Sequence, residues 1–304
     1  MQNQPAVRIV RKFALPINSV FRPDVTDSDE EEQLAYEAEF NPTGLLLKEV
    51  KNFPDGDASE IHVYLYDDKG RLLEHHLDIP ADGISERFIT VRNADGNPVC
   101  ITKFYGEDKG EHTDYTFGTH AQPVKIVQFD ADGELEQTEE LEFDDKARMI
   151  LRKTIHANGD PTKILSFTYN DHGWMMSQIE TNDSGKQVSR LVFEYDDEGR
   201  ELKTKQYNAE DKFSAEITSV YDDNGRLIRK TSRGFYTRIS QYEYDEQGNL
   251  KEESLSDENG FVISRNRFAY DEGNRLAEET VYETDLTRSG RDTHFSHRYE
   301  YEFH

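Results

Sequence analysis

The sequence contains a single cysteine, Cys100, among its 304 residues. An intramolecular disulfide is therefore impossible, and so is a zinc site built on several thiolates. Because Val99 and Ile101 flank it, we expect Cys100 to be a buried or half-buried strand thiol that is chemically inert.

Long apolar runs are also missing. The first twenty residues, MQNQPAVRIVRKFALPINSV, contain no apolar run of signal-peptide length, since Arg8, Arg11 and Lys12 interrupt it. No stretch approaches the ~18–20 apolar residues of a spanning helix. We therefore expect a cytoplasmic protein without membrane insertion, and export by a signal-independent route stays open.

Familiar catalytic motifs are missing as well. The sequence has no phosphate-binding G-x-x-x-x-G-K-[ST], no G-x-S-x-G and no H-E-x-x-H. The acidic segments at Asp55 and Asp130 lack the glutamate of a calcium-binding loop, and the ten histidines are scattered. We expect a non-enzymatic protein with no cofactor and no metal. A site assembled from distant residues is the alternative.

Basic residues are scarce, with 36 against 62 acidic ones, for a net charge of −26. Such a charge repels nucleic acid and anionic membranes, because both are bound through Lys and Arg. It predicts a protein partner with a basic face and no nucleic acid. The simpler interpretation is that the charge keeps the protein soluble. The oligomeric state is not indicated.

An internal repeat is what the sequence has in abundance. The pattern aromatic-x-Tyr-Asp-x-x-Gly-x-Leu recurs in ten units from residue 40 to about residue 296, four of them degenerate, at spacings of 25 or 26 residues and once of 23. A second Asp-, Asn- or Gly-rich turn lies near the middle of each unit, and the segments between turns alternate apolar and polar residues. Period two with these turns is typical of antiparallel hairpins.

These features predict an all-β fold, an antiparallel β-meander of about ten two-strand repeats. Because strand twist accumulates, we expect it to coil into a superhelical strip or an elongated shell. Residues 1–39 would form an N-terminal cap with a strand and a possible short helix starting at Asp27 or Ser28. Residues 40–296 would form the repeat domain, and residues 297–304 a C-terminal closing strand.

The motif aromatics should stack as an apolar ladder on one face of the sheet. The expected ladder residues are Tyr66, Phe143, Tyr169, Phe193, Tyr195, Tyr221, Tyr242, Tyr244, Phe268 and Tyr270. Trp174 stands where other units carry Arg or Asn after the turn glycine. With Met175 and Met176 it is a candidate partner-contact spot, and the alternative is that it caps the ladder.

The segments FEYDDEGR at Phe193–Arg200 and YDDNGRL at Tyr221–Leu227 resemble the YD (RHS) repeat. The resemblance covers most of residues 60–283 and implies a spiral β-sheet and an association with bacterial polymorphic toxin systems. Nothing after Tyr270 resembles the core and autoprotease of that family, or a toxin domain. The period is longer than expected for the family.

The function expected from these observations is that of a non-enzymatic, protein-binding β-repeat scaffold with an acidic surface. The resemblance implies a specific version, an immunity or chaperone partner of a basic toxin domain. The alternatives are a carbohydrate-binding or surface-adhesion protein, whose exposed tyrosines would stack on sugars, and an enzyme with an unrecognised site.

Overall fold

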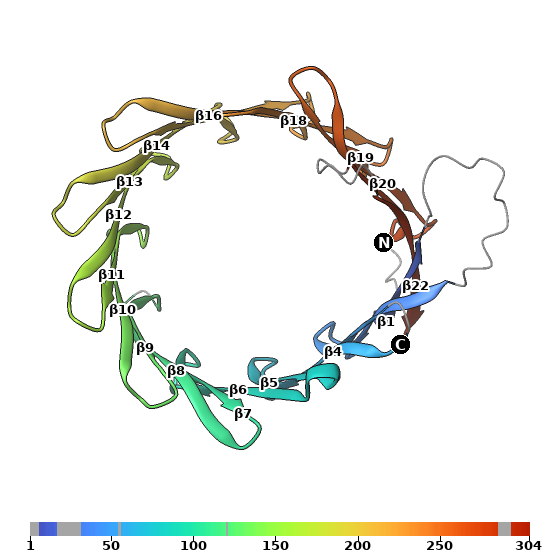
Figure 1. The fold of residues 1–304 in the computed structure, drawn as a ribbon, viewed down its shortest axis with the longest axis horizontal. Coiled ribbons are helices and arrows are strands. Elements are labelled where there is room, and N and C mark those ends of the chain that lie inside the picture. Colours follow the sequence, from blue (N-terminus) through green and yellow to red (C-terminus); the bar gives the residue numbers. More distant parts are fainter. Residues whose placement is uncertain (1–5, 17–31, 54–55, 120, 285–292) are drawn as a thin grey trace. The chain divides into compact units, whose positions relative to one another are not determined.

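The computed structural model describes residues 6–16, 32–53, 56–119, 121–284 and 293–304. Strands make up nearly all of the described chain (Figure 1). They are β1 (Val7–Pro16), β2 (Gln33–Phe40), β3 (Leu46–Asn52), β4 (Ala58–Tyr66), β5 (Leu72–Ile79), β6 (Ile84–Arg92), β7 (Pro98–Tyr105), β8 (Asp108–Phe117), β9 (Pro123–Phe129), β10 (Leu135–Phe143), β11 (Met149–His156), β12 (Pro161–Tyr169), β13 (Met175–Thr181), β14 (Gln187–Tyr195), β15 (Glu201–Tyr207), β16 (Phe213–Tyr221), β17 (Leu227–Arg233), β18 (Thr237–Tyr244), β19 (Leu250–Asp257), β20 (Val262–Tyr270), β21 (Leu276–Glu283) and β22 (Thr293–Phe303), with one 3₁₀ turn at Pro80–Asp82.

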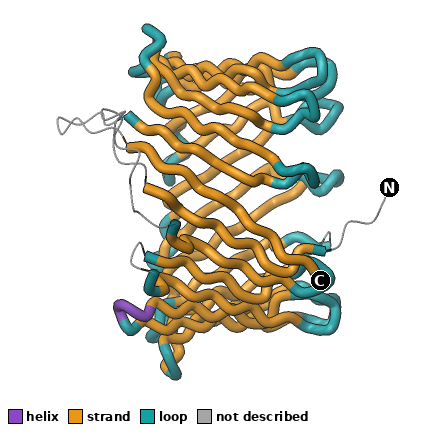
Figure 2. Tube along the Cα trace, turned by 90° about the vertical axis from the view of Figure 1, so that its right-hand side faces the viewer, coloured by secondary structure: helices purple, strands orange, loops and turns teal. Residues whose placement is uncertain are grey.

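Two compact units divide the chain. Unit 1 comprises Met1–Ser85, Tyr221–Lys230 and Thr237–His304, and unit 2 comprises Glu86–Val220 and Thr231–Tyr236. Within each unit, strands that follow one another in the sequence pair in antiparallel fashion, as β11, β12, β13 and β14 do in unit 2. For unit 1, Figure 2 shows the strands lying side by side between turns at both of their ends.

The prediction of a superhelical strip or elongated shell is wrong. All 22 strands belong to one antiparallel sheet, and within unit 1 the first strand, β1, pairs with the last strand, β22. β1 also pairs with β2, and β22 with β21, so the sheet closes on itself where the chain begins and ends. Closure removes the unpaired backbone groups that an open strip would leave at its two edges.

The N-terminal segment is a strand where a helix was expected. Gln33–Phe40 is β2 and pairs with both β1 and β3. Its alternation of Tyr36, Ala38 and Phe40 with Glu37 and Glu39 has the period of a strand. The helix start expected at Asp27 or Ser28 lies outside the described residues.

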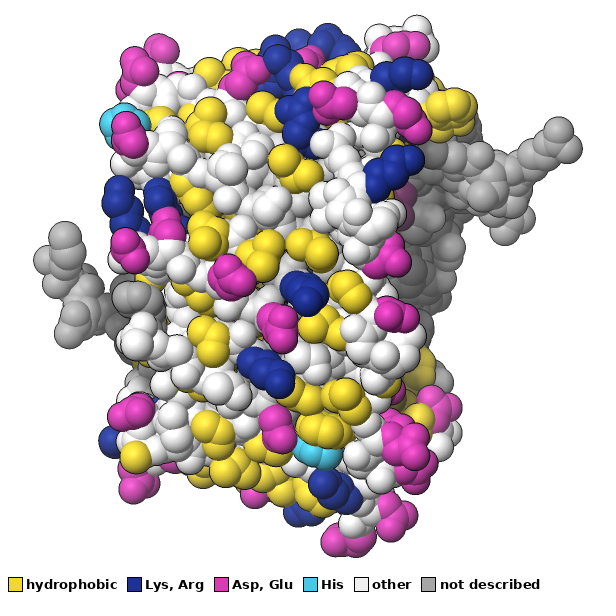
Figure 3. Space-filling view, turned by 90° about the vertical axis from the view of Figure 1, so that its left-hand side faces the viewer, with side chains coloured by type: hydrophobic (Ala, Val, Ile, Leu, Met, Phe, Trp, Pro, Cys, Tyr) yellow, Lys and Arg dark blue, Asp and Glu magenta, His cyan; other side chains and the backbone are white. Residues whose placement is uncertain are grey.

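The sheet is one layer thick, and its core is correspondingly thin. Among the described residues, four apolar side chains are buried, those of Ile9, Ala38, Leu141 and Val281. Apolar and charged side chains alternate over the visible surface in Figure 3. All ten expected ladder residues are half-buried, and their stacking as one apolar ladder stays a prediction.

Candidate functional site

The motif turns that begin with aspartate are built by local hydrogen bonds to that residue. In the turn at Asp196, the amide of Asp196 donates to the Arg200 carbonyl at 3.0 Å, and the amide of Gly199 donates to the Asp196 carbonyl at 3.1 Å. Gly199 has φ +82°, as the last residue of a three-residue hairpin loop with a bulge requires. The Asp196 carboxylate also accepts the amides of Glu198 and Arg200 at 3.0 and 2.8 Å.

The same aspartate is paired with the arginine that follows the glycine. Five turns have this ion pair at 2.5–2.7 Å: Asp67–Arg71, Asp144–Arg148, Asp196–Arg200, Asp222–Arg226 and Asp271–Arg275. Hydrogen bonding from Arg71 is the main reason that the pKa of Asp67 falls to about 2. The acidic residue that comes next in each turn is exposed: Asp68, Asp145, Asp197, Asp223 and Glu272. One carboxylate per turn is thus neutralised by the arginine, and at least one more is exposed.

Five tyrosines each tie their hairpin to the one before it through the side-chain hydroxyl. The hydroxyl of Tyr169 donates to the backbone carbonyl of Met149 at 2.7 Å, across 20 residues of sequence. Tyr66, Tyr244 and Tyr270 make the equivalent bond to the carbonyls of Leu46, Leu227 and Leu250, at 2.7–2.9 Å. Tyr301 of β22, which takes the place of a motif tyrosine after Tyr270, bonds the carbonyl of Leu276 at 2.8 Å. These tyrosines therefore act as polar rungs between hairpins.

The turn arginine then covers the ring of the next motif tyrosine. The guanidinium carbon lies 4.8 Å from the Tyr169 ring centre for Arg148, 4.7 Å from that of Tyr244 for Arg226, and 5.2 Å from that of Tyr301 for Arg275. A cation over the face of an aromatic ring is attracted by the ring quadrupole. Aspartate, arginine and the following tyrosine form one recurring stack, which we call the Asp–Arg–Tyr stack.

Trp174 takes the arginine position of this stack in unit 2. Its ring lies 5.6 Å from that of Tyr195 and 4.9 Å from that of His172, and a Cβ atom on Gly199 would be 2.7 Å from it. Trp174 is half-buried, as are Met175, which is the cross-strand partner of Tyr169, and Met176. A partner contact through these three residues stays a prediction.

A group of titratable side chains in unit 1 was missed by sequence reasoning. The Glu49 carboxylate accepts the hydroxyls of Tyr36 at 3.0 Å and Tyr64 at 2.7 Å. Burial, followed by the bond to Glu49, raises the pKa of Tyr36 to about 12. The His75 ring stacks on Tyr64 at 4.7 Å, and its Nε2 lies 2.9 Å from Nδ1 of His62.

A second group of this kind surrounds Glu279, also in unit 1. Its carboxylate accepts hydrogen bonds from Lys12 at 3.3 Å and Tyr299 at 3.1 Å and lies 3.2 Å from Nδ1 of His297. Burial raises the pKa of Glu279, but the charge of Lys12 and the hydrogen bonds together outweigh it and lower that pKa. The Glu49 and Glu279 carboxylates are each held by side chains of the protein itself, which indicates a structural network.

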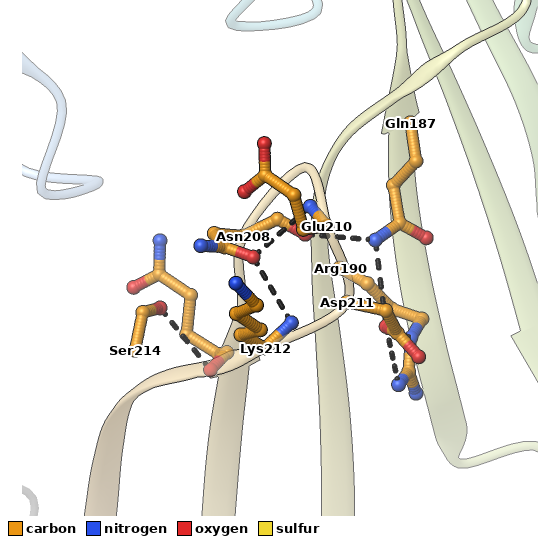
Figure 4. Close-up of polar contacts among 8 residues, drawn as sticks. Gln187, Arg190, Asn208, Glu210, Asp211, Lys212 and Ser214 are labelled. Carbon is orange, nitrogen blue, oxygen red and sulfur yellow. Dashed lines mark hydrogen bonds and ion pairs between the residues drawn. The ribbon is translucent and has the colours of Figure 1, made fainter.

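Exposed aromatic rings gather at the mid-repeat turns of unit 2. Phe235 is 92% exposed, Tyr236 66% and Phe213 58%. Phe213 follows the loop shown in Figure 4, which has Asp211 at φ +58° where other turns have glycine. Arg190 of the neighbouring strand holds the Asp211 carboxylate at 2.7 Å. The signal available in the sequence was the Phe-Tyr pair directly after the turn glycine, Gly234.

The remaining sequence candidates offer little chemistry. Cys100 is half-buried in β7, and burial raises the pKa of its thiol. Within the described ranges, no three His, Cys, Asp or Glu side chains are arranged to hold a metal ion. In the same part of the chain, no helix is long and apolar enough to cross a membrane.

Comparisons with known proteins give distant likenesses. A family model described as "Uncharacterised protein" matches residues 140–285. No curated protein matches the sequence. Among solved structures, the chain is similar to TcdB2-TccC3 (13% identity, TM-score 0.35, covering 86% of this chain and 21% of that one) and to TcdB2-TccC3-TEV (11% identity, TM-score 0.34, covering 86% and 18%). It is also similar to a porin-like protein from Bacteroides uniformis ATCC 8492 (11% identity, TM-score 0.36, covering 97% and 98%). The chain spans about a fifth of the length of the two TcdB2-TccC3 structures.

Proposed function

We propose that this chain is a non-enzymatic, protein-binding β-repeat scaffold, and that its partner presents a basic face to the edge formed by the motif turns. The observation that supports this is that the first two acidic residues of such a turn differ in their surroundings. The first is held by the turn arginine, as Asp196 is by Arg200, and the second, such as Asp197, is exposed. Successive turns thus repeat a negative charge at the same position.

Such an edge favours encounter with a basic protein, because complementary charge steers association and makes its rate depend on salt. The same proposal includes the family of this chain. Its YD-like motifs support membership in the YD (RHS) repeat family, restricted to the β-repeat portion of that family. A basic toxin domain is the specific partner that the resemblance suggests.

The experiment compares two triple variants in unit 2 as baits in one bacterial lysate. In the first, Asp145, Asp171 and Asp197 of the motif turns are replaced by Asn. In the second, the exposed mid-repeat residues Asp132, Asp160 and Asp183 are replaced by Asn, which changes the net charge equally.

A protein that wild type and the second variant retain, and that the first variant loses, is the expected partner. Its association rate with wild type, measured by stopped flow, should fall severalfold between low and physiological salt. Equal retention by both variants, or a flat salt series, would overturn the proposal.

A carbohydrate ligand is the second candidate, supported by the exposed rings of Phe235 and Tyr236, which lie edge-to-face at 4.8 Å. A glycan array probed with wild type and with the F235A/Y236A double variant tests it. Glycan signals that disappear in the double variant would favour this candidate, and an array without signals would remove it.

A further inference from the structure

The motif turn at Asp245 in unit 1 lacks its own arginine. Asn249 stands at the position that Arg226 and Arg275 occupy in the turns before and after it. Its Nδ2 donates to the Asp245 carboxylate at 2.9 Å, so it replaces the arginine as the partner of the turn aspartate. The amide then pairs with Asn274, whose Nδ2 donates to Asn249 Oδ1 at 3.1 Å.

The ring of Tyr270 consequently has an open face. In the repeat before it, Arg226 lies over Tyr244, and in the repeat after it, Arg275 lies over Tyr301. The asparagine side chain is too short to reach the equivalent place over Tyr270. In the described part of the chain, no cation lies over the Tyr270 ring.

A cleft of about 460 Å³ occupies this place. Tyr270, Phe268 and Ala269 line it, together with three acidic residues, Asp245, Asp271 and Glu272, and the amide-bearing residues Gln247, Asn249 and Asn274. Asp271 is paired with Arg275, and Lys251 contributes one positive charge to the lining. Asp245 and the Tyr270 face are the same two partners that a turn arginine has elsewhere, as Asp222 and Tyr244 are for Arg226.

We propose that this cleft binds the guanidinium group of an arginine side chain from the partner protein, which completes the Asp–Arg–Tyr stack that the chain leaves incomplete at Asn249. The inference rests on the proposed function, because it gives the basic partner one defined contact. Arginine fits better than lysine, since its planar guanidinium stacks on an aromatic ring and binds a carboxylate through two donors at once.

The test uses a single arginine with blocked ends, N-acetyl-arginine methylamide, titrated into the full chain while the Tyr270 ring signals are followed by NMR. The matching citrulline derivative has the same shape without the charge. We expect saturable shifts with the arginine compound at millimolar concentration and shifts at least tenfold weaker with the citrulline compound.

Two variants place the binding at this cleft. Asn249→Arg supplies the missing guanidinium from the chain itself and should reduce binding at least tenfold. Asn97→Arg makes the same change at the same turn position in unit 2, where it leaves the Tyr270 cleft open, and should bind like wild type. Asp245→Asn should weaken binding about fivefold by removing the carboxylate, which keeps the test decisive if Asn249→Arg does not fold.

Equal shifts from the arginine and citrulline compounds, or undiminished binding by both Asn249→Arg and Asp245→Asn, would overturn the inference. A basic partner that wild type and Asn249→Arg retain equally would overturn it too, while leaving the proposed function intact. Failure of the proposed function shows differently, as equal capture by the two triple aspartate variants.

Discussion

Removing one hydroxyl from a motif tyrosine should cost a measurable amount of stability. Tyr169→Phe keeps the ring and its contact with the Arg148 guanidinium at 4.8 Å but deletes the 2.7 Å bond to the Met149 carbonyl. A hydrogen bond of this kind contributes about 1 kcal/mol net, and the half-buried site still admits water to the carbonyl. We expect a loss of about 1 kcal/mol in the free energy of unfolding.

The matched control is Tyr115→Phe. The Tyr115 ring is half-buried in the same unit, and its hydroxyl has no hydrogen-bond partner within the described residues. This variant should change stability by less than about 0.5 kcal/mol. Urea unfolding followed by circular dichroism gives both values from the shift of the midpoint at constant slope.

The role of the tyrosine as a polar rung is refuted if the two variants lose equal stability, or if Tyr169→Phe loses nothing. The Tyr244→Phe and Tyr270→Phe variants extend the test, because their bonds to the preceding hairpin are equivalent. Values that differ severalfold among the three would show that the rungs are not independent repeats of one interaction.

Two more perturbations probe the motif turns. Gly199→Ala brings a methyl group to 2.7 Å from the Trp174 ring, whereas Gly133→Ala meets no atom within 4 Å at a similar positive φ. The first should therefore cost at least about 1 kcal/mol more than the second by urea unfolding, and equal losses would contradict the packing of Trp174. Acid should loosen the turns as well: the pKa of Asp67 is lowered to about 2 by Arg71, so its stabilisation is present above about pH 4 and is lost as the pH falls toward 2. Asp67→Asn should show a shallower loss of stability over that window than wild type, and identical profiles would contradict the assignment.

The hairpins were predictable because their causes are local. The turn at Asp196 needs a positive φ at Gly199 and hydrogen bonds to the side chain of one aspartate. Residues 196–200 meet both requirements by themselves. The cross-strand pairing of each motif tyrosine with the residue two places after the glycine, such as Tyr244 with Leu250, follows from the same turn.

Closure of the sheet was not predictable in the same way. β1 and β22 pair through residues almost 300 positions apart, and Arg11 in β1 is held by Glu37 at 2.6 Å and by Glu302 at 2.5 Å. In the sequence these residues read as scattered charges. Their ion pairs can be assigned only when the strands on both sides of β1 are known, because the partners of these charges lie on neighbouring strands and not nearby in the sequence.

The Glu49 group escaped detection for a related reason. Tyr36, Glu49, Tyr64 and His75 come from four different strands, and each is unremarkable in its own segment. The hydrogen bond of the motif tyrosine to the preceding hairpin was missed for the same reason. The sequence shows that the tyrosine is repeated, but it does not show which acceptor its hydroxyl reaches. Contacts between hairpins depend on the register of the sheet, and period and turn chemistry determine register only within a hairpin.

The acidic character of the protein follows from the repeat itself. Each complete motif turn contains one arginine, and in three of these turns, with Arg148, Arg226 and Arg275, that arginine contacts both its own aspartate and the ring of the next tyrosine. A turn such as Tyr-Asp-Asp-Glu-Gly-Arg at Tyr195 keeps more carboxylates than this single cation can neutralise. Such a turn therefore keeps uncompensated negative charge, and under the function that we propose a basic partner would meet these turns and supply the cation that the turn at Asn249 lacks.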